Sequence, residues 1–123
     1  MGPTNEPLVA IVDDDELFRR SVERLIRSAG FSVETFGSAE DFLERGNLDT
    51  TACAILDMRL PGLDGFELQR LLITRPRRIP IVIVSAHEDA VIQANALRAG
   101  AIAYLKKPFD NSTLLDAVHR AVR

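Results

Sequence analysis

The stretch LVAIVDDDE, residues 8–16, joins five apolar residues directly to four acidic ones. A continuous apolar run without alternating polar residues is typical of a strand that is buried on both faces of a sheet. Three similar runs follow along the chain, and one alternating run is typical of an edge strand. The predicted strands cover residues 8–12, 31–36, 52–56, 81–84 and 101–105.

A segment with a helical pattern follows each predicted strand. Apolar residues recur on one stripe of these segments, which cover residues 16–28, 38–45, 66–74, 88–99 and 112–122. Alternation of strand and helix predicts a parallel sheet with helices on both faces, here with strand order 2-1-3-4-5. On the first helix, a spacing of four residues predicts the ion pairs Arg19–Glu23 and Glu23–Arg27.

Length and composition indicate one globular domain. The chain has 123 residues, of which 46% are hydrophobic and 27% are charged. Residues 1–7 (MGPTNEP) have the composition of a flexible leader, which leaves 8–123 for the domain. A net charge of −3 with scattered basic residues argues against direct nucleic-acid binding.

Cysteine content and hydropathy indicate the compartment. The single cysteine, Cys53, allows no intrachain disulfide and favours a reducing environment. No apolar run approaches the ~18 residues that a membrane span needs. We therefore expect a cytoplasmic domain without membrane contact.

Polar residues follow four of the predicted strands at the point where each strand ends. Asp13 and Asp14 follow the first strand, Asp57 the third and Ser85 the fourth, and Lys107 lies just beyond the fifth. In open α/β sheets, ligands bind outside the carboxyl ends of the strands, where the strand order reverses. We therefore expect these side chains to converge on one cleft.

Three crowded carboxylates repel one another unless a positive charge lies among them. Mg²⁺ is a hard cation that accepts carboxylate oxygens while keeping waters and a phosphate oxygen. A carboxylate beside such a metal can attack phosphorus, while lysine and serine contact the phosphoryl oxygens, so we predict phosphoryl transfer onto Asp57. Acidic residues are also favoured at a solvated helix N-terminus, and this explains Asp15 and Glu16. It is an alternative explanation for Asp13 and Asp14 when these two residues are considered by themselves.

Four motifs carry a resemblance to a known family. They are VDDDE at 12–16, ILDMRLPGLDGFEL at 55–68, IVIVSAHED at 81–89 and ALRAGAIAYLKKPF at 96–109. Through these motifs, residues 8–122 strongly resemble the receiver domain of two-component response regulators. The resemblance implies a doubly wound, flavodoxin-like (β/α)5 fold of class α/β.

The resemblance also implies roles for residues around the acidic cluster. Asp57 corresponds to the phospho-acceptor of the family. Asp13 and Asp14 correspond to the acidic pair that holds Mg²⁺ together with Asp57. The backbone carbonyl of Arg59 corresponds to a further metal ligand.

Other positions match the parts of the family that respond to phosphorylation. Ser85 occupies the position of the hydroxyl that follows the phosphoryl group, and Lys107 that of the lysine that pairs with it. Tyr104 matches the aromatic switch position, for which core packing is the alternative. The bond before Pro108 resembles the family's cis peptide. From the residues alone, Gly65 is expected to shape the turn after the third strand through a positive φ.

Two residues lie on the predicted rim of the site. Arg59 comes two residues after Asp57, and His87 comes two residues after Ser85. We hypothesise that Arg59 and His87 tune the lifetime of the phosphorylated aspartate. Simple solvent exposure is the alternative.

The function that the resemblance implies is a phosphorylation-activated signalling switch rather than an enzyme. A sensor histidine kinase donates the phosphoryl group, docking on the helix at 16–28 and the loop after the fifth strand. The surface of the fourth helix, fifth strand and fifth helix then controls a phosphorylation-dependent homodimer or an output domain, by analogy one for transcription. The domain catalyses only its own phosphorylation and dephosphorylation.

Two alternative functions stay open. The spacing Asp13-x-Asp15 resembles the paired aspartates of haloacid dehalogenase-type phosphatases, in which Asp13 would be the nucleophile. Leu17 departs from the Thr or Val that is usual there. The other alternative is a module that binds partners without being phosphorylated.

Overall fold

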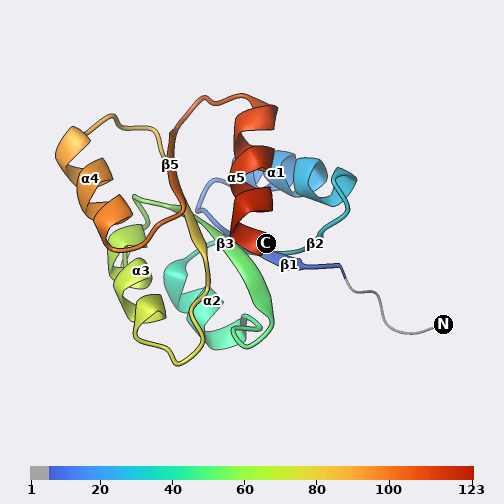
Figure 1. Cartoon of the computed structure of the whole chain (residues 1–123), viewed down its shortest axis with the longest axis horizontal. Coiled ribbons are helices and arrows are strands. Elements are labelled where there is room, and N and C mark those ends of the chain that lie inside the picture. Colours follow the sequence, from blue (N-terminus) through green and yellow to red (C-terminus); the bar gives the residue numbers. More distant parts are fainter. Residues whose placement is uncertain (1–5) are drawn as a thin grey trace.

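Five strands alternate with five helices in the computed structural model, which describes residues 6–123 (Figure 1). The elements are β1 (Leu8–Val12), α1 (Glu16–Ser28), β2 (Ser32–Phe36), α2 (Ala39–Arg45), β3 (Thr51–Asp57), α3 (Gly65–Ile73), β4 (Ile81–Ser85), α4 (Ala90–Arg98), β5 (Ala103–Lys106) and α5 (Asn111–Val122). Among these described residues, no helix combines the length and the apolar character that crossing a membrane requires.

The sheet has the predicted topology. All strand pairs are parallel, and the order is β2-β1-β3-β4-β5. Strands β2 and β3 lie on either side of β1, so the strand order reverses at β1. This confirms the prediction of a doubly wound α/β fold.

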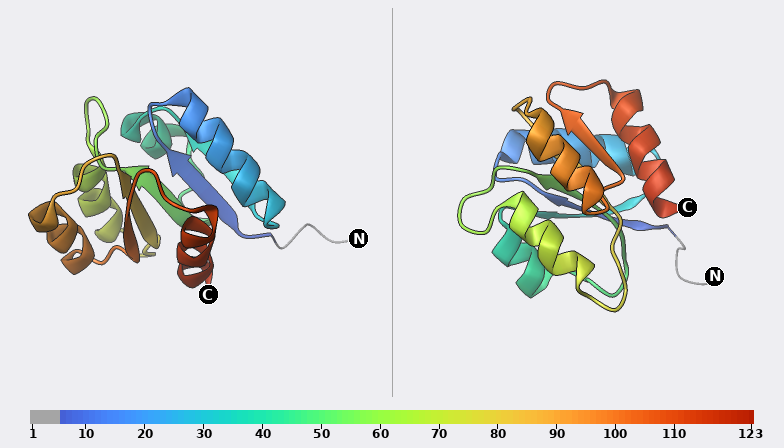
Figure 2. Two further views of the ribbon diagram at one scale, coloured as in Figure 1. Left: turned by 90° about the horizontal axis from the view of Figure 1, so that it is seen from above. Right: turned by 60° about the vertical axis from the view of Figure 1, so that its left-hand side comes forward.

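Two apolar layers cover the two faces of the sheet. Successive strand residues point to opposite faces, so Ile55 packs against α1 and α5 while Leu56 packs against α2, α3 and α4. The right-hand view in Figure 2 shows α1 and α5 on one side of the strands and α2 and α3 on the other. Cys53 lies in the first layer with no exposed surface, and burial raises the pKa of its thiol to about 12. Its role is packing.

Two element boundaries differ from the predictions by two residues, and the other boundaries agree to within one residue. Helix α4 begins at Ala90 rather than at residue 88, because Asp89 is its N-cap and accepts the Val91 and Ile92 N–H groups. Strand β5 begins at Ala103 rather than at residue 101. The N–H of Ala101 instead donates to the Ala96 carbonyl, so this residue completes the end of α4.

The predicted leader at 1–7 lies mostly outside the described residues. Its last two residues border the edge strand. The Pro7 carbonyl accepts the Ser32 N–H at 3.0 Å, and the Ser32 hydroxyl donates to Glu6 at 3.2 Å. These two residues therefore continue along the start of β2.

Candidate functional site

The carboxyl ends of the central strands bring three carboxylates together. Asp13 follows β1 and is 1% exposed, and Asp57 ends β3 and is 8% exposed. One oxygen from each of Asp13, Asp14 and Asp57 lies within 4.8 Å of the other two. Asp14 is exposed at the mouth of this cluster. The predicted convergence of these residues is thus present in the structure.

Lys107 provides the positive charge beside the cluster. Its Nζ lies 2.8 Å from Asp13 Oδ2 and 3.7 Å from Asp57 Oδ2. The residue follows β5, and its peptide bond to Pro108 is cis. The side chain is 20% exposed, so it reaches the carboxylates from the edge of the site.

Backbone N–H groups hold the remaining carboxylate oxygens. Asp13 Oδ1 accepts the Asp15 N–H at 2.9 Å, and Asp57 Oδ1 accepts the Arg59 N–H at 3.2 Å. Burial raises the pKa of Asp57, and the negative charge of Asp13 raises it further. The Arg59 N–H and Lys107 oppose this rise in pKa only in part. Asp57 therefore carries a negative charge that its surroundings do not fully compensate.

The cluster fits a divalent cation such as Mg²⁺. An octahedral Mg²⁺ holds its oxygen ligands at ~2.1 Å, which keeps two ligand oxygens within about 4.2 Å of each other. The three oxygens lie within 4.8 Å of one another, so the side chains would draw closer around one ion. All three donors are hard carboxylate oxygens, and the exposed Asp14 leaves one side open to water.

Ser85 and Tyr104 are connected through His87. Ser85 is 1% exposed at the end of β4, and its Oγ accepts the His87 N–H at 3.1 Å. The hydroxyl of the half-buried Tyr104 donates to the His87 carbonyl at 3.2 Å. The backbone of one residue in the β4–α4 loop therefore joins the predicted phosphoryl-contacting serine to the predicted switch tyrosine.

The rim residues are exposed. Arg59 and His87 both have solvent-accessible side chains beside the site. Exposure is compatible with a role in tuning hydrolysis and equally with simple solvation. Their influence on phosphoryl lifetime stays a prediction.

Gly65 is needed for a different reason than the one expected. Its φ is not positive, whereas Gly62 in the same loop has φ 72°. A Cβ on Gly65 would overlap the Asp57 carbonyl oxygen and the Met58 backbone. The first residue of α3 therefore packs directly on the end of β3, and glycine permits this close approach. Asp64 caps α3 through a capping box with Glu67.

Two residues of α1 that contact the site were not predicted from the sequence. Arg19 does not pair with Glu23 as expected. Its Nη1 donates to the Asp13 carbonyl at 2.6 Å, and Glu23 pairs with Arg27 instead. The ring of Phe18 lies 4.0 Å from Lys107 Nζ. In the sequence, only their position in the first turns of α1, directly after the acidic run, indicated that they could lie near the site.

Comparison with known proteins places the chain and its fold in one class. The family model described as the response regulator receiver domain matches residues 9–119. The chain belongs to this family. Solved structures agree: the response regulator StyR has a TM-score of 0.88 at 45% identity, covering 95% of this chain and 59% of that one. The BeF3-activated DrrB receiver domain has a TM-score of 0.84 at 30% identity, covering 95% and 97%.

Curated relatives include transcriptional regulators. Nodulation protein W of Bradyrhizobium diazoefficiens is 41% identical, over 94% of this chain and 51% of the relative. Transcriptional regulatory protein TdiR of Thauera aromatica is 40% identical, over 96% of this chain and 52% of the relative. The chain therefore spans about half the length of these relatives.

We expect Asp57→Asn to raise the melting temperature at pH 7 in EDTA by about 4 °C. In a domain of this size, such a shift corresponds to ~1 kcal/mol in the free energy of unfolding. Because the pKa of Asp57 is raised, its ionised form destabilises the folded chain. That penalty is absent below the ordinary pKa of aspartate and grows as pH rises through the raised pKa. The gain from Asn should therefore shrink toward acid pH.

Circular dichroism melts between pH 4 and 8 measure this effect. Asp49→Asn is the control, since Asp49 is exposed and pairs only at the surface with Arg75. A lower melting temperature for Asp57→Asn at pH 7 would contradict the prediction.

Proposed function

We propose that this domain is a phosphorylation-activated switch that accepts a phosphoryl group on Asp57 from a sensor histidine kinase. The observation that carries the proposal is the position of the Asp57 carboxylate. It lies beside the acidic pair Asp13 and Asp14, and the ammonium of Lys107 is 3.7 Å from its Oδ2. An oxygen nucleophile, a site for a divalent cation and a counter-charge for phosphoryl oxygens thus meet at one point.

The proposed reaction is a direct displacement at phosphorus. A carboxylate oxygen of Asp57 forms the new P–O bond, and the P–N bond to the kinase histidine breaks, so the imidazole leaves with the bonding electron pair. Asp13, Asp14, Asp57 and the Arg59 carbonyl would hold Mg²⁺, which neutralises charge on the transferring oxygens. Lys107, 3.7 Å from Asp57 Oδ2, is near enough to contact these oxygens after a small movement.

The proposed response begins at Ser85. Its hydroxyl turns toward the phosphoryl group, which disturbs its bond with the His87 N–H. Tyr104, held by the His87 carbonyl, is then released to turn inward. A local charge change would in this way alter the surface formed by α4, β5 and α5. Moving such a switch from 1:99 to 99:1 requires ~5.5 kcal/mol.

The geometry disfavours a phosphatase with Asp13 as nucleophile. Asp13 is buried, and its two oxygens are engaged by the Asp15 N–H and by Lys107. Within residues 6–123, Asp57 has one hydrogen-bonded oxygen, which accepts the Arg59 N–H. A module that works without phosphorylation would not need these groups to be assembled.

The partners are inferred from the family and its members. Receiver domains interact with sensor kinases and with output domains, and the relatives include proteins named as transcriptional regulators. We propose that the kinase docks on α1 and the β5–α5 loop. The whole protein would act in the cytoplasm and use a separate output domain to control transcription.

Phosphorylation is tested with acetyl phosphate and Mg²⁺. We expect an adduct of about 80 Da in intact-mass spectra, since one phosphoryl group replaces one proton. The adduct should be absent in Asp57→Asn and in EDTA. Asp64→Asn, at the cap of α3, is the control and should retain it. An adduct on Asp13 in place of Asp57 would support the phosphatase alternative.

Activation should also produce a dimer. The surface of α4 carries exposed apolar side chains, with Val91 69% and Leu97 41% exposed. We expect the apparent mass in size-exclusion chromatography with light scattering to double on adding beryllofluoride and Mg²⁺. Val91→Asp, which places a charge on this surface, should prevent the change. A persistent monomer of the unmodified chain would argue against dimerisation.

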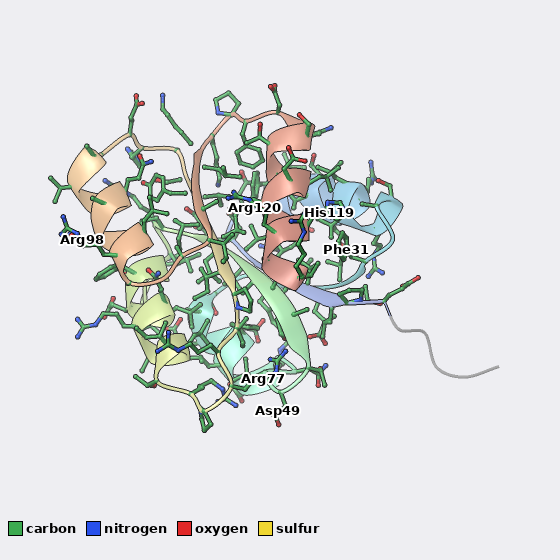
Figure 3. The ribbon with its side chains drawn as sticks, in the orientation of Figure 1. Phe31, Asp49, Arg77, Arg98, His119 and Arg120 are labelled. Carbon is green, nitrogen blue, oxygen red and sulfur yellow. The ribbon has the colours of Figure 1, made fainter. Side chains whose placement is uncertain are left out.

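The rim residues should set the phosphoryl lifetime. We expect Arg59→Ala and His87→Ala each to shorten the half-life of phospho-Asp57 by about threefold, since a smaller side chain opens the path of the attacking water. Decay of the phosphorylated mass after removal of the donor measures this. Arg120→Ala, in the last turn of α5 (labelled in Figure 3), is the control. Unchanged lifetimes would leave simple solvation as the explanation.

A further inference from the structure

The ring of Phe18 covers one side of the Lys107 ammonium. The distance from Nζ to the ring centroid is 4.0 Å, well inside the ~6 Å over which a cation is attracted to an aromatic face. On another side, the same nitrogen lies 2.8 Å from Asp13 Oδ2 and 3.7 Å from Asp57 Oδ2. The ammonium is thus contacted by an aromatic ring and by carboxylates.

The Phe18 ring is itself held in place. It meets the ring of Phe109 edge to face, with centroids 6.1 Å apart and an angle of 88°. The Phe18 backbone lies in the first turn of α1, where its N–H donates to the capping Asp15 at 3.3 Å. Phe109 follows Pro108 in the β5–α5 loop. The ring is therefore positioned by the segments that follow β1 and β5.

Lysine needs such a support more than most residues do. Its ammonium is carried on a flexible stem of four carbons and is strongly hydrated. The Lys107 side chain is 20% exposed, so solvent competes with the carboxylates for the charge. An aromatic face attracts the cation without accepting a strong hydrogen bond, and it leaves the N–H groups available to oxygens.

We propose that Phe18 is a positioning residue for phosphoryl transfer, acting through Lys107. Its ring keeps the Lys107 ammonium beside Asp57. The ammonium is therefore already in position when the phosphoryl oxygens arrive, and the lysine side chain does not have to reorient. Phe18 does not contact the reacting atoms. This inference rests on the proposed phosphorylation of Asp57.

The test compares Phe18→Tyr, Phe18→Leu and Phe18→Met in phosphorylation by acetyl phosphate with Mg²⁺. Tyrosine retains an aromatic face, and leucine and methionine retain only apolar volume. We expect the initial rate to fall about 3–10-fold in the Leu and Met variants and to stay within about twofold of the original in the Tyr variant.

The matched control is Phe31→Leu. Phe31 belongs to the same side of the core but packs on His119, with centroids 5.3 Å apart. Figure 3 shows Phe31 next to His119 of α5. This variant also loses a ring and some stability, yet it leaves Lys107 untouched. We expect it to be phosphorylated at the original rate while it is folded.

Nuclear magnetic resonance gives a readout that loss of stability does not imitate. Protons above an aromatic face are shifted upfield, so the ε-methylene protons of Lys107 should show this shift in the original chain and in Phe18→Tyr. They should return to ordinary values in Phe18→Leu and Phe18→Met. The measurement on the original chain requires no variant to fold.

Each result separates the two proposals. An original chain that takes no phosphoryl group on Asp57 would overturn the proposed function. If it is phosphorylated, then Leu and Met variants at or above the original rate would overturn the role of Phe18 alone. An equal loss in Phe31→Leu, or the absence of the upfield shift in the original chain, would do the same.

Discussion

Repulsion among three carboxylates, held in check by one lysine, is the constraint on which the site depends. Asp13 and Asp57 are buried at neighbouring strand ends, where burial and the charge of Asp13 raise the pKa of Asp57. Lys107 lies within 2.8 Å of one carboxylate and 3.7 Å of the other. One ammonium neutralises the three carboxylates only in part. The remaining negative charge favours a divalent cation, and the addition of a phosphoryl group changes the local charge strongly.

The rest of the fold supports this balance. Parallel strands deliver Asp13, Asp57 and Ser85 to one edge, because the carboxyl ends of such strands share one end of the sheet. Gly65 lets α3 begin against the carbonyl of Asp57. Arg19 reaches back from α1 to the carbonyl of Asp13. Each of these contacts limits how far the carboxylates can move apart.

The predictions from sequence succeeded where a local pattern has one physical interpretation. Continuous apolar runs predicted the buried strands, and the acidic and basic residues after them lie close together in the structure, as expected. Boundaries were less accurate where hydrogen bonds decide them. Ala101 is apolar and was predicted to begin a strand, but its N–H donates to the Ala96 carbonyl in α4. Arg19 has a partner at the right helical spacing in Glu23, yet a backbone carbonyl of another segment is the acceptor it uses.

The sequence by itself determined the order of the elements, the α/β class and the acidic and basic residues of the site, since apolar periodicity and strand ends are local properties of the chain. Only the tertiary structure decided what surrounds Lys107. The contact of its ammonium with Phe18, and of Phe18 with Phe109, depends on how α1 lies against the β5–α5 loop. These residues are some 90 positions apart, and no local spacing relates them, so their meeting follows from the packing of the whole domain.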